Sequence, residues 1–400
     1  MDSKLNQQQR LAYNNIISPI TTIVTGSAGT GKTFVLSQAV NELLSQNKKI
    51  LICSPTHQSL KVIKKAVNIT HPNLVFKTIA STLVKFPWMD SNSGDTYFSR
   101  GKLSKVLQQS DYIFIDEISS VSERDFSLIC GLSHIKNVNI FGDFAQLLPV
   151  KQKQIRLENL SIKYSHINLT EQMRNTSDIE SLAEENREKI SLPKQSSKNI
   201  KLLKSEDKLL ETFLLNLEKS ENPLSMCYLA YTNKVVEKIS SKISLQKFPY
   251  LRLSSNYNKI AKNGDILEVI KNPSETISDD DFGFKYKILE VKHLETETFF
   301  SLHYVDNYNF EILNQGREKL KSLLPHIKDA KYSKIILDQI KYLDSFPIFS
   351  SPFVLTVHKS QGSTYNEVYI NSHDILKSTN KKRLMYVAIS RAKEKLYLSH

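Results

Sequence analysis

Eight residues, Gly26 to Thr33, have the types and the spacing of a phosphate-binding loop. Glycines in such a loop allow a tight turn whose successive N–H groups point at a polyphosphate. Lys32 would then reach the β- and γ-phosphates, and Thr33 would offer its hydroxyl to Mg²⁺. The β-branched run Thr21 to Thr25 precedes the loop and an apolar-periodic helix from Phe34 to Leu44 follows it. Because this is the context that the motif requires, the sequence predicts a site for a nucleoside triphosphate.

Two further polar groups follow apolar strands. Asp116 and Glu117 come directly after the predicted strand Asp111 to Ile115, and Gln146 follows the predicted strand Asn137 to Phe141. A carboxylate after such a strand can hold Mg²⁺, and a following glutamate can polarise the attacking water. Acidic pairs also begin helices, so the phosphate-binding loop is what favours the catalytic interpretation. The amide of Gln146 fits ligand sensing in the crevice of an open parallel sheet.

Other side chains suit contacts to a nucleotide or to a phosphate backbone. Gln9, upstream of the loop, can read an adenine edge with one donor and one acceptor. Pro55, Thr56 and His57 follow the predicted strand Lys49 to Cys53, and hydroxyl groups at a strand end suit phosphate contact. The alternative is that Thr56 is a helix N-cap and His57 a surface histidine.

Composition limits the number of domains, the kind of partner and the compartment. The chain has 400 residues, enough for two or three domains of about 100–200 residues each. Its net charge of +13 favours a polyanionic partner, although a solvated lysine-rich surface would give the same value. Three cysteines lie far apart without metal-ligand spacing, which favours a reducing compartment. We see no membrane span or signal segment, and we expect an intracellular (cytoplasmic) protein.

The element pattern predicts two α/β regions with two insertions. Strands and helices alternate over residues 1–168, which indicates a doubly wound domain. Within them, residues 84–106 read as a β-hairpin whose aromatic residues either stack on bases or form a mini-core. The polar stretch 175–201 reads as a loop at the domain boundary. Beyond it we expect a strand over 225–231, a helix over 234–245, short strands within 258–312, lysine-rich helices over 319–343, and a return to α/β structure from residue 353.

The order of these motifs resembles superfamily-one helicases of the RecD/Dda branch. The matching segments are Gln9, Gly26 to Thr33, Ser54 to His57, Thr78 to Thr82, Asp116 to Ser119, Gly142 to Val150, Leu169 to Arg174, Thr356 to Ser363 and Val387 to Lys393. Ser54, Ser120 and Ser390 stand where that family often has Ala, Met and Thr. None of these departures removes a charge or a metal ligand.

The resemblance implies an α/β fold: two RecA-like P-loop lobes, with a small β-hairpin insert in the first and a small β-barrel (SH3-like) insert in the second. The expected boundaries are 1–168 for lobe one, 84–106 for the hairpin, 169–257 for the first part of lobe two, 258–350 for the barrel and helical insert, and 351–400 for the last part of lobe two.

The resemblance also implies an ATP-dependent DNA helicase and single-strand translocase that moves 5′ to 3′ with ATP and Mg²⁺. The implied catalytic residues are Lys32, Asp116, Glu117, Gln146, Arg174 and Arg391, with Thr33 and Asp116 as metal ligands. The implied nucleotide-binding residues are Gln9, Gly26, Ser27, Ala28, Gly29, Thr30, Gly31, Lys32, Thr33 and Gly362. The implied nucleic-acid contacts are Pro55, Thr56, His57, Thr78, Thr82, Trp88, Phe98, Thr356, His358 and Ser360.

The implied partners are single-stranded DNA and single/double-strand junctions, with replication or recombination proteins beside them, and a monomer is the default expectation. Two other functions stay open. An RNA helicase of the same superfamily is one, because nothing in the sequence reads a 2′-hydroxyl and the preference for DNA rests on the resemblance. A catalytically silent nucleic-acid-binding module is the other, and the completeness of the charged site argues against it.

Overall fold

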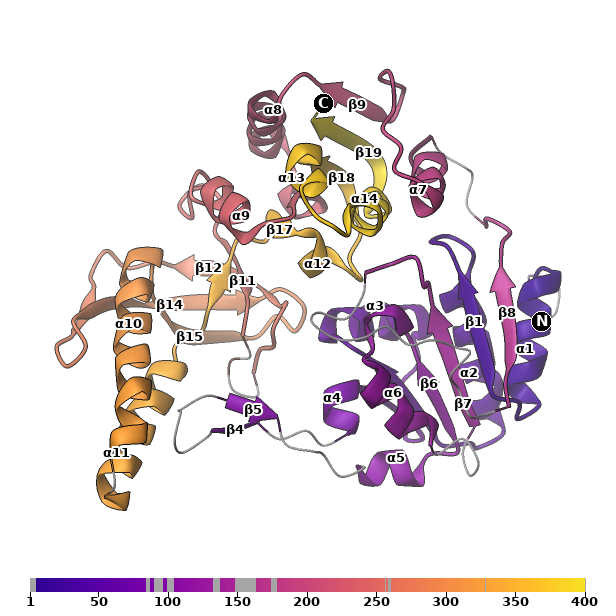
Figure 1. Ribbon diagram of the computed structural model, residues 1–400, viewed down its shortest axis with the longest axis horizontal. Helices are drawn as coiled ribbons and strands as arrows, with labels where there is room; N and C mark the ends of the chain where they lie inside the picture. The colour runs from indigo at the N-terminus through magenta and orange to yellow at the C-terminus, as the bar shows by residue number, and fades with distance from the viewer. Residues whose placement is uncertain are drawn as a thin grey trace. The chain divides into compact units, whose positions relative to one another are not determined.

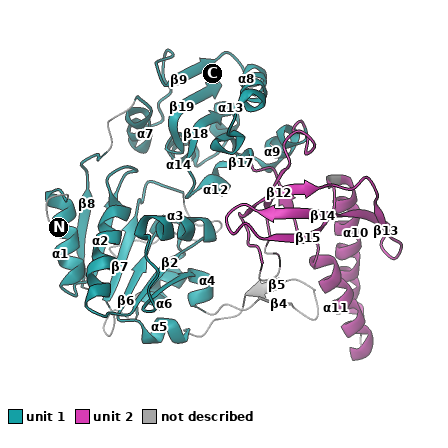
Figure 2. Cartoon of the chain, turned by 180° about the vertical axis from the view of Figure 1, so that it is seen from behind, with its two compact units in different colours: residues 1–84, 103–241, 353–400 teal, residues 85–102, 242–352 magenta. Residues whose placement is uncertain are grey.

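The structure is a computed structural model that describes residues 5–83, 104–131, 137–147, 163–173, 178–255, 257, 260–327 and 329–399, and the backbone of 87–89 and 96–98. The side chains of Cys130 and Asn307 lie outside this description. The chain divides into two compact units: unit 1 comprises residues 1–84, 103–241 and 353–400, and unit 2 comprises 85–102 and 242–352 (Figure 2). No helix among the described residues is long and apolar enough to cross a membrane.

Unit 1 contains a first parallel sheet with the strand order β3-β2-β6-β7-β1-β8 (Figure 1). Its strands are β1 Thr22–Gly26, β2 Ile50–Ser54, β3 Leu74–Thr78, β6 Tyr112–Ile115, β7 Asn137–Gly142 and β8 Ser165–Leu169. Its helices are α1 Gln7–Ile17, α2 Lys32–Ser45, α3 His57–Val67, α4 Ile79–Thr82, α5 Lys105–Gln109 and α6 Glu123–Cys130, with the 3₁₀ turn η2 Ile118–Ser120.

Successive side chains of these strands point to opposite faces of the sheet, and apolar residues form a core on each face. Val24, Ile52, Phe114 and Phe141 pack in one cluster with apolar residues of α1, α2 and α3. Their neighbours Ile23, Leu51, Ile113 and Ile140 pack in the other cluster with residues of α5 and α6. Because successive side chains of a strand point to opposite faces, a run of apolar residues is what a sheet covered on both sides requires.

Unit 1 also contains a second parallel sheet, with the order β17-β10-β18-β19-β9. Its strands are β9 Ile200–Leu203, β10 Met226–Ala230, β17 Val354–Thr356, β18 Tyr365–Ile370 and β19 Ala392–Ser399. Its helices are α7 Asp178–Glu188, α8 Glu206–Lys219, α9 Asn233–Ser240, α12 Val357–Ser360, α13 Ser372–Leu376 and α14 Lys381–Ile389. The predicted pair of RecA-like lobes is confirmed.

One local prediction is wrong. The stretch 175–201 was expected to be a loop, yet its described part contains helix α7 and the start of β9. Ile179, Leu182 and Ala183 are spaced three and four residues apart and are buried in the second lobe. This short apolar stripe is enough to anchor a helix whose other residues are almost all polar.

Unit 2 contains an antiparallel sheet followed by two long helices. Its strands are β11 Tyr250–Leu253, β12 Ile266–Lys271, β13 Ile277–Asp279, β14 Phe284–His293, β15 Phe299–Tyr304 and β16 Phe349–Ser350. Its helices are α10 Asn307–Leu323 and α11 Ala330–Asp344. Strands were expected up to residue 312, but Asp306 caps α10 by accepting a hydrogen bond from Asn309 N at 2.8 Å, so the helix begins earlier. The SH3-like barrel stays a prediction.

Two short strands lie within the segment predicted as a hairpin. Strand β4 Pro87–Met89 pairs antiparallel with β5 Thr96–Phe98, with Trp88 opposite Tyr97. The side chains of this segment, including those of Trp88 and Phe98, lie outside the described residues. Their role in base stacking therefore stays a prediction.

Candidate nucleotide site and nucleic-acid interface

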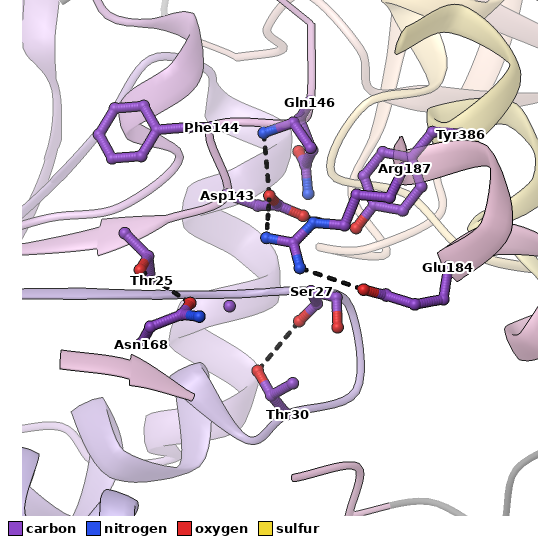
Figure 3. Close-up of polar contacts among 12 residues, drawn as sticks. Thr25, Ser27, Thr30, Asp143, Phe144, Gln146, Asn168, Glu184, Arg187 and Tyr386 are labelled. Carbon is purple, nitrogen blue, oxygen red and sulfur yellow. Dashed lines mark hydrogen bonds and ion pairs between the residues drawn. The ribbon is translucent and has the colours of Figure 1, made fainter. Parts of the chain in front are cut away.

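The phosphate-binding loop connects the end of β1 to the start of α2. Gly29 and Gly31 adopt left-handed backbone conformations, with φ of 90° and 85°. Side chains rarely adopt the φ of Gly31, and a Cβ atom there would also lie 2.4 Å from Nε2 of Gln9, so glycine is favoured. The Thr30 hydroxyl donates to the Ser27 carbonyl at 3.0 Å and braces the turn (Figure 3). The loop thus presents the N-terminus of a 14-residue helix to an anion.

Lys32 lies folded against this loop. Its Nζ donates to the carbonyl oxygens of Gly26 and Ser27 at 2.7 and 2.8 Å. Burial lowers the pKa of Lys32, whereas the charges of Asp143, Asp116 and Glu117 oppose that shift. A bound phosphate would replace neutral carbonyl acceptors by charged oxygens, which make stronger hydrogen bonds with an ammonium group.

Gln9 is fully buried at the start of α1, against the loop. Its Nε2 donates to Thr30 O at 3.1 Å, and its Oε1 accepts from Asn6 N at 3.1 Å as half of a capping box. A primary amide has a second hydrogen on nitrogen and a second lone pair on oxygen. The predicted adenine contact is therefore compatible with the hydrogen bonds that Gln9 already makes.

Asp116 and Glu117 follow β6 in an enclosed position. Burial, and then the charge of Glu117, raise the pKa of Asp116 to about 7. Glu117 has a left-handed φ of 56°, and its Oε2 is buried with no hydrogen-bond partner among the described residues. A non-glycine residue in this conformation costs free energy, and such residues cluster at functional sites.

These groups fit a magnesium ion. Mg²⁺ binds through one or two carboxylates together with substrate phosphates and waters, rather than through a cage of protein ligands alone. Two adjacent enclosed carboxylates suit a divalent cation, and Asp116 and Thr33 are the proposed ligands. In the described ranges no group of three or more His, Cys, Asp or Glu residues could hold a metal ion unaided.

Arg391, at the end of α14 in the second lobe, is buried. It donates through Nε to Val387 O at 3.1 Å, through Nη1 to Ser363 O at 3.1 Å, and through Nη2 to Ser390 Oγ at 3.0 Å. Burial lowers the pKa of Arg391, and the charge of Glu117 is the largest opposing influence. The guanidinium is therefore electrostatically coupled to the first lobe. Arg174, the other predicted arginine, lies outside the described residues.

Gln146 is contacted from the second lobe. Gln361 Nε2 donates to Ser120 Oγ at 2.8 Å and to Gln146 Oε1 at 3.3 Å. At the next position, Gly362 has φ of 80°, and a Cβ there would lie 3.2 Å from Ser59 Oγ at the start of α3. Residues after α12 thus contact the predicted γ-phosphate sensor and lie close to Ser59 of the first lobe.

The structure adds residues that the sequence did not suggest. Asp143 is fully buried; its Oδ1 accepts from Arg187 Nη2 at 3.2 Å, and its Oδ2 accepts from the Tyr386 hydroxyl. Burial and the charge of Asp143 raise the pKa of Tyr386. Figure 3 shows Arg187 between Asp143 and Glu184. Asp143 follows a buried strand and lies in the matching segment Gly142 to Val150, whereas Arg187 lies in the segment expected to be a loop.

A pocket opens beside the phosphate-binding loop. Gln172 closes one side, since its Nε2 donates to Ser27 Oγ at 2.9 Å while Met173 N donates to Gly29 O at 3.1 Å. Both lobes line this pocket, through Ser27, Ala28, Gln172, Ile179, Glu180, Ala183, Glu184, Tyr386, Ser390 and Ala392.

Three predicted nucleic-acid threonines are helix N-caps. Thr56, Thr78 and Thr356 accept backbone N–H groups at the starts of α3, α4 and α12, at 3.1, 3.2 and 3.3 Å. Thr56 and His358 are exposed, while Pro55 and His57 are partly exposed. The capping role that was the alternative for Thr56 is therefore present, and the Thr56 hydroxyl also lies 2.6 Å from Ser59 Oγ.

Two of the predicted contact residues are enclosed. Thr82 and Ser360 are fully buried, and their hydroxyls donate to Thr78 O at 2.9 Å and to Val357 O at 2.8 Å. Hydroxyls in a helix commonly bond to carbonyls of the preceding turn. The structure places these side chains at the ends of short helices, and their contact with a strand stays a prediction.

Sequence comparisons find similarity to helicase domains and to helicases of other organisms. Residues 9–152 match an AAA domain family, and residues 352–399 match a UvrD-like helicase C-terminal domain. An uncharacterized protein of Acanthamoeba polyphaga mimivirus is 25% identical, over 98% of this chain and 99% of its own length. The RecD subunit of the RecBCD enzyme of Buchnera aphidicola is 23% identical over 96% of this chain and 70% of its own. The ATP-dependent DNA helicase Pif1 of Campylobacter jejuni is 23% identical over 96% and 87%.

Solved structures share the fold. Pif1 helicases described as unwinding forked double-stranded DNA match with a TM-score of 0.56 and 17% identity, over 99% of this chain and 92% of theirs. Pif1 from Bacteroides, in complex with ADP-AlF3 and single-stranded DNA, matches with a TM-score of 0.55 and 16% identity over the same shares. The likeness to Dda in particular stays an interpretation of the motifs.

Proposed function

We propose that this chain moves 5′ to 3′ along single-stranded DNA and opens duplexes at single/double-strand junctions. The chain belongs to the superfamily-one helicases of the RecD and Pif1 type and is an ATP-dependent DNA helicase. The observation that carries the proposal is that both lobes contribute to the surroundings of one phosphate-binding loop. The 5′-to-3′ direction comes from the resemblance to the RecD branch, because motors of both polarities share this motif chemistry.

The chemistry follows from the residues around the loop. Lys32, with Thr33 and Asp116 around Mg²⁺, would hold the β- and γ-phosphates, and Glu117 would orient and deprotonate the attacking water. Gln146 would sense the γ-phosphate, while Arg391 and Arg174 would supply positive charge to it. Because these groups come from two lobes, ATP binding would favour one arrangement of the lobes and product release another. If each lobe holds the strand, through Thr56 and His57 on one and Thr356 and His358 on the other, that cycle moves the strand.

The deciding experiment is an unwinding assay on paired duplexes that carry either a 5′ or a 3′ single-stranded tail. We expect ATP- and Mg²⁺-dependent unwinding of the 5′-tailed duplex and little unwinding of the 3′-tailed one. Unwinding from the 3′ tail alone would overturn the assigned direction. The same assay with matched RNA duplexes tests the preference for DNA. We also infer that the protein works inside the cell among replication or recombination proteins.

Single-strand affinity should fall steeply with salt. Several Lys and Arg residues would neutralise phosphates and release counterions, so the logarithm of the affinity should fall with the logarithm of salt by roughly 0.7 per contacted phosphate. Base sequence should matter little, because backbone contacts and stacking read no base identity. Fluorescence anisotropy with labelled oligonucleotides across a salt series measures both, and an affinity independent of salt would contradict the proposal.

The segment 84–106 is the proposed wedge that splits the duplex. Replacing Trp88 or Phe98 by Ala should reduce unwinding while single-strand-stimulated ATP hydrolysis stays near normal, because base stacking is worth ~1–3 kcal/mol per base. Thr96→Ala, in the same strand pair, is the matched control. Equal losses of unwinding and hydrolysis would mean that the aromatic residue only packs the hairpin.

A further inference from the structure

Arg383, on helix α14 of the second lobe, binds the turn that carries Gln146. Its Nη1 donates to the carbonyl oxygens of Phe144 and Gln146, the latter at 2.6 Å. The two carbonyls converge because residues 143–146 form a tight turn, in which Gln146 N donates to Asp143 O at 3.1 Å. One guanidinium thus fixes both ends of the three-residue segment 144–146.

The same turn is held at two more points. One helical turn beyond Arg383, Tyr386 donates its hydroxyl to Asp143, and Arg187 of α7 donates to that carboxylate at 3.2 Å. Residues three apart on a helix share a face, so Arg383 and Tyr386 act on the turn together. Leu147, which directly follows Gln146 in the chain, is buried in the apolar core of the second lobe.

We propose that Arg383 is a positioning residue, through which helix α14 of the second lobe fixes the orientation of the γ-phosphate-sensing amide of Gln146. This inference rests on the proposed function, which makes Gln146 the sensor. Arg383 donates to two backbone carbonyls of the turn that carries Gln146, so the proposed role is exerted through Gln146. Any displacement of α14 would move the amide relative to the phosphate-binding loop.

Alternative explanations make different predictions. If Arg383 only stabilises the lobe interface, its loss should lower thermal stability and affect ATP and ADP binding alike. If Arg383 positions Gln146, its loss should impair only the steps in which a γ-phosphate is bound, namely ATP binding and ATP hydrolysis. A hydrogen bond to a charged group is worth about 1.5–3 kcal/mol, so its loss corresponds to roughly a tenfold to hundredfold effect.

The experiment uses the full chain with Arg383→Ala, Gln146→Ala and the double variant. We expect Arg383→Ala to lower DNA-stimulated kcat by about tenfold to a hundredfold and to weaken binding of a non-hydrolysable ATP analogue, while ADP affinity stays unchanged. In the double variant, the loss should be close to that of Gln146→Ala alone, because both changes remove the same function. Arg383→Lys, which can still donate to two carbonyls, should recover part of the activity.

Lys382→Ala is the matched control, because Lys382 is the preceding residue of the helix and donates instead to Glu188 O at 3.1 Å. Losses that add in the double variant, or equal losses of ATP-analogue and ADP affinity, would overturn the positioning role while leaving Gln146 as sensor. A Gln146→Ala variant with full turnover would instead overturn the sensor assignment and this inference with it. If Arg383→Ala fails to fold, the same comparison with Arg383→Lys decides.

Discussion

Replacing Glu117 by Gln should lower DNA-stimulated ATP hydrolysis by about 10²- to 10⁴-fold, the usual contribution of a general base. The amide keeps the size of the side chain, but an NH2 donor replaces one acceptor oxygen and the group cannot take a proton from water. Glu117 Oε2 is buried without a hydrogen-bond partner among the residues that the structure describes, so it has no described protein hydrogen bond to give up when it accepts from a water molecule. Steady-state hydrolysis at saturating ATP and single-stranded DNA measures the loss.

Binding should be retained in this variant, because Glu117 is assigned to water and not to phosphate. Lys32→Ala should differ by losing both hydrolysis and ATP affinity, since Lys32 is assigned to the phosphates. The matched control is Glu123→Gln, the same chemical change at the first residue of α6. Undiminished turnover in the Glu117 or the Lys32 variant would refute the assignment of the catalytic site.

The sequence predicted the elements that place this site because each motif residue follows a local pattern. A β-branched or apolar run ends immediately before the phosphate-binding loop and before Asp116, and the corresponding strands β1 and β6 lie in one parallel sheet. In such a sheet the carboxyl ends of the strands share an edge, so local signals suffice to bring distant motifs together.

The contacts between lobes could not be read in the same way. Arg383 binds backbone carbonyls of residues 144 and 146, and a carbonyl has no sequence identity. Asp143 meets Arg187 and Tyr386 across 44 and 243 positions of the chain. Burial was equally invisible for Thr82 and Ser360, because a hydroxyl residue in a motif has the same letter whether it faces a ligand or the preceding helical turn.

Arg391→Ala should lower turnover by about 10³- to 10⁵-fold if this residue supplies charge to the γ-phosphate in the transition state. Single-strand affinity measured without nucleotide should change much less, because the residue is assigned to the nucleotide. Arg174→Ala should behave in the same way. Lys393→Ala, an exposed cation two residues beyond Arg391, is the control for the loss of a positive charge.

From the structure we expect Arg391→Ala to have a second effect, a loss of stability. All three described hydrogen bonds of the Arg391 side chain go to residues of its own lobe, namely Ser363, Val387 and Ser390. Truncation removes the Arg391 donor from Ser363 O, whereas Val387 O still accepts from the Ser390 hydroxyl at 2.8 Å. Leaving a buried carbonyl unsatisfied costs roughly 1–3 kcal/mol. Arg391→Lys separates the two roles, because lysine keeps the charge but cannot reproduce a planar guanidinium with several fixed donors. If turnover falls in parallel with the melting temperature across both variants, Arg391 is structural; if Arg391→Lys melts near the wild-type temperature yet stays inactive, the guanidinium itself acts on the phosphate.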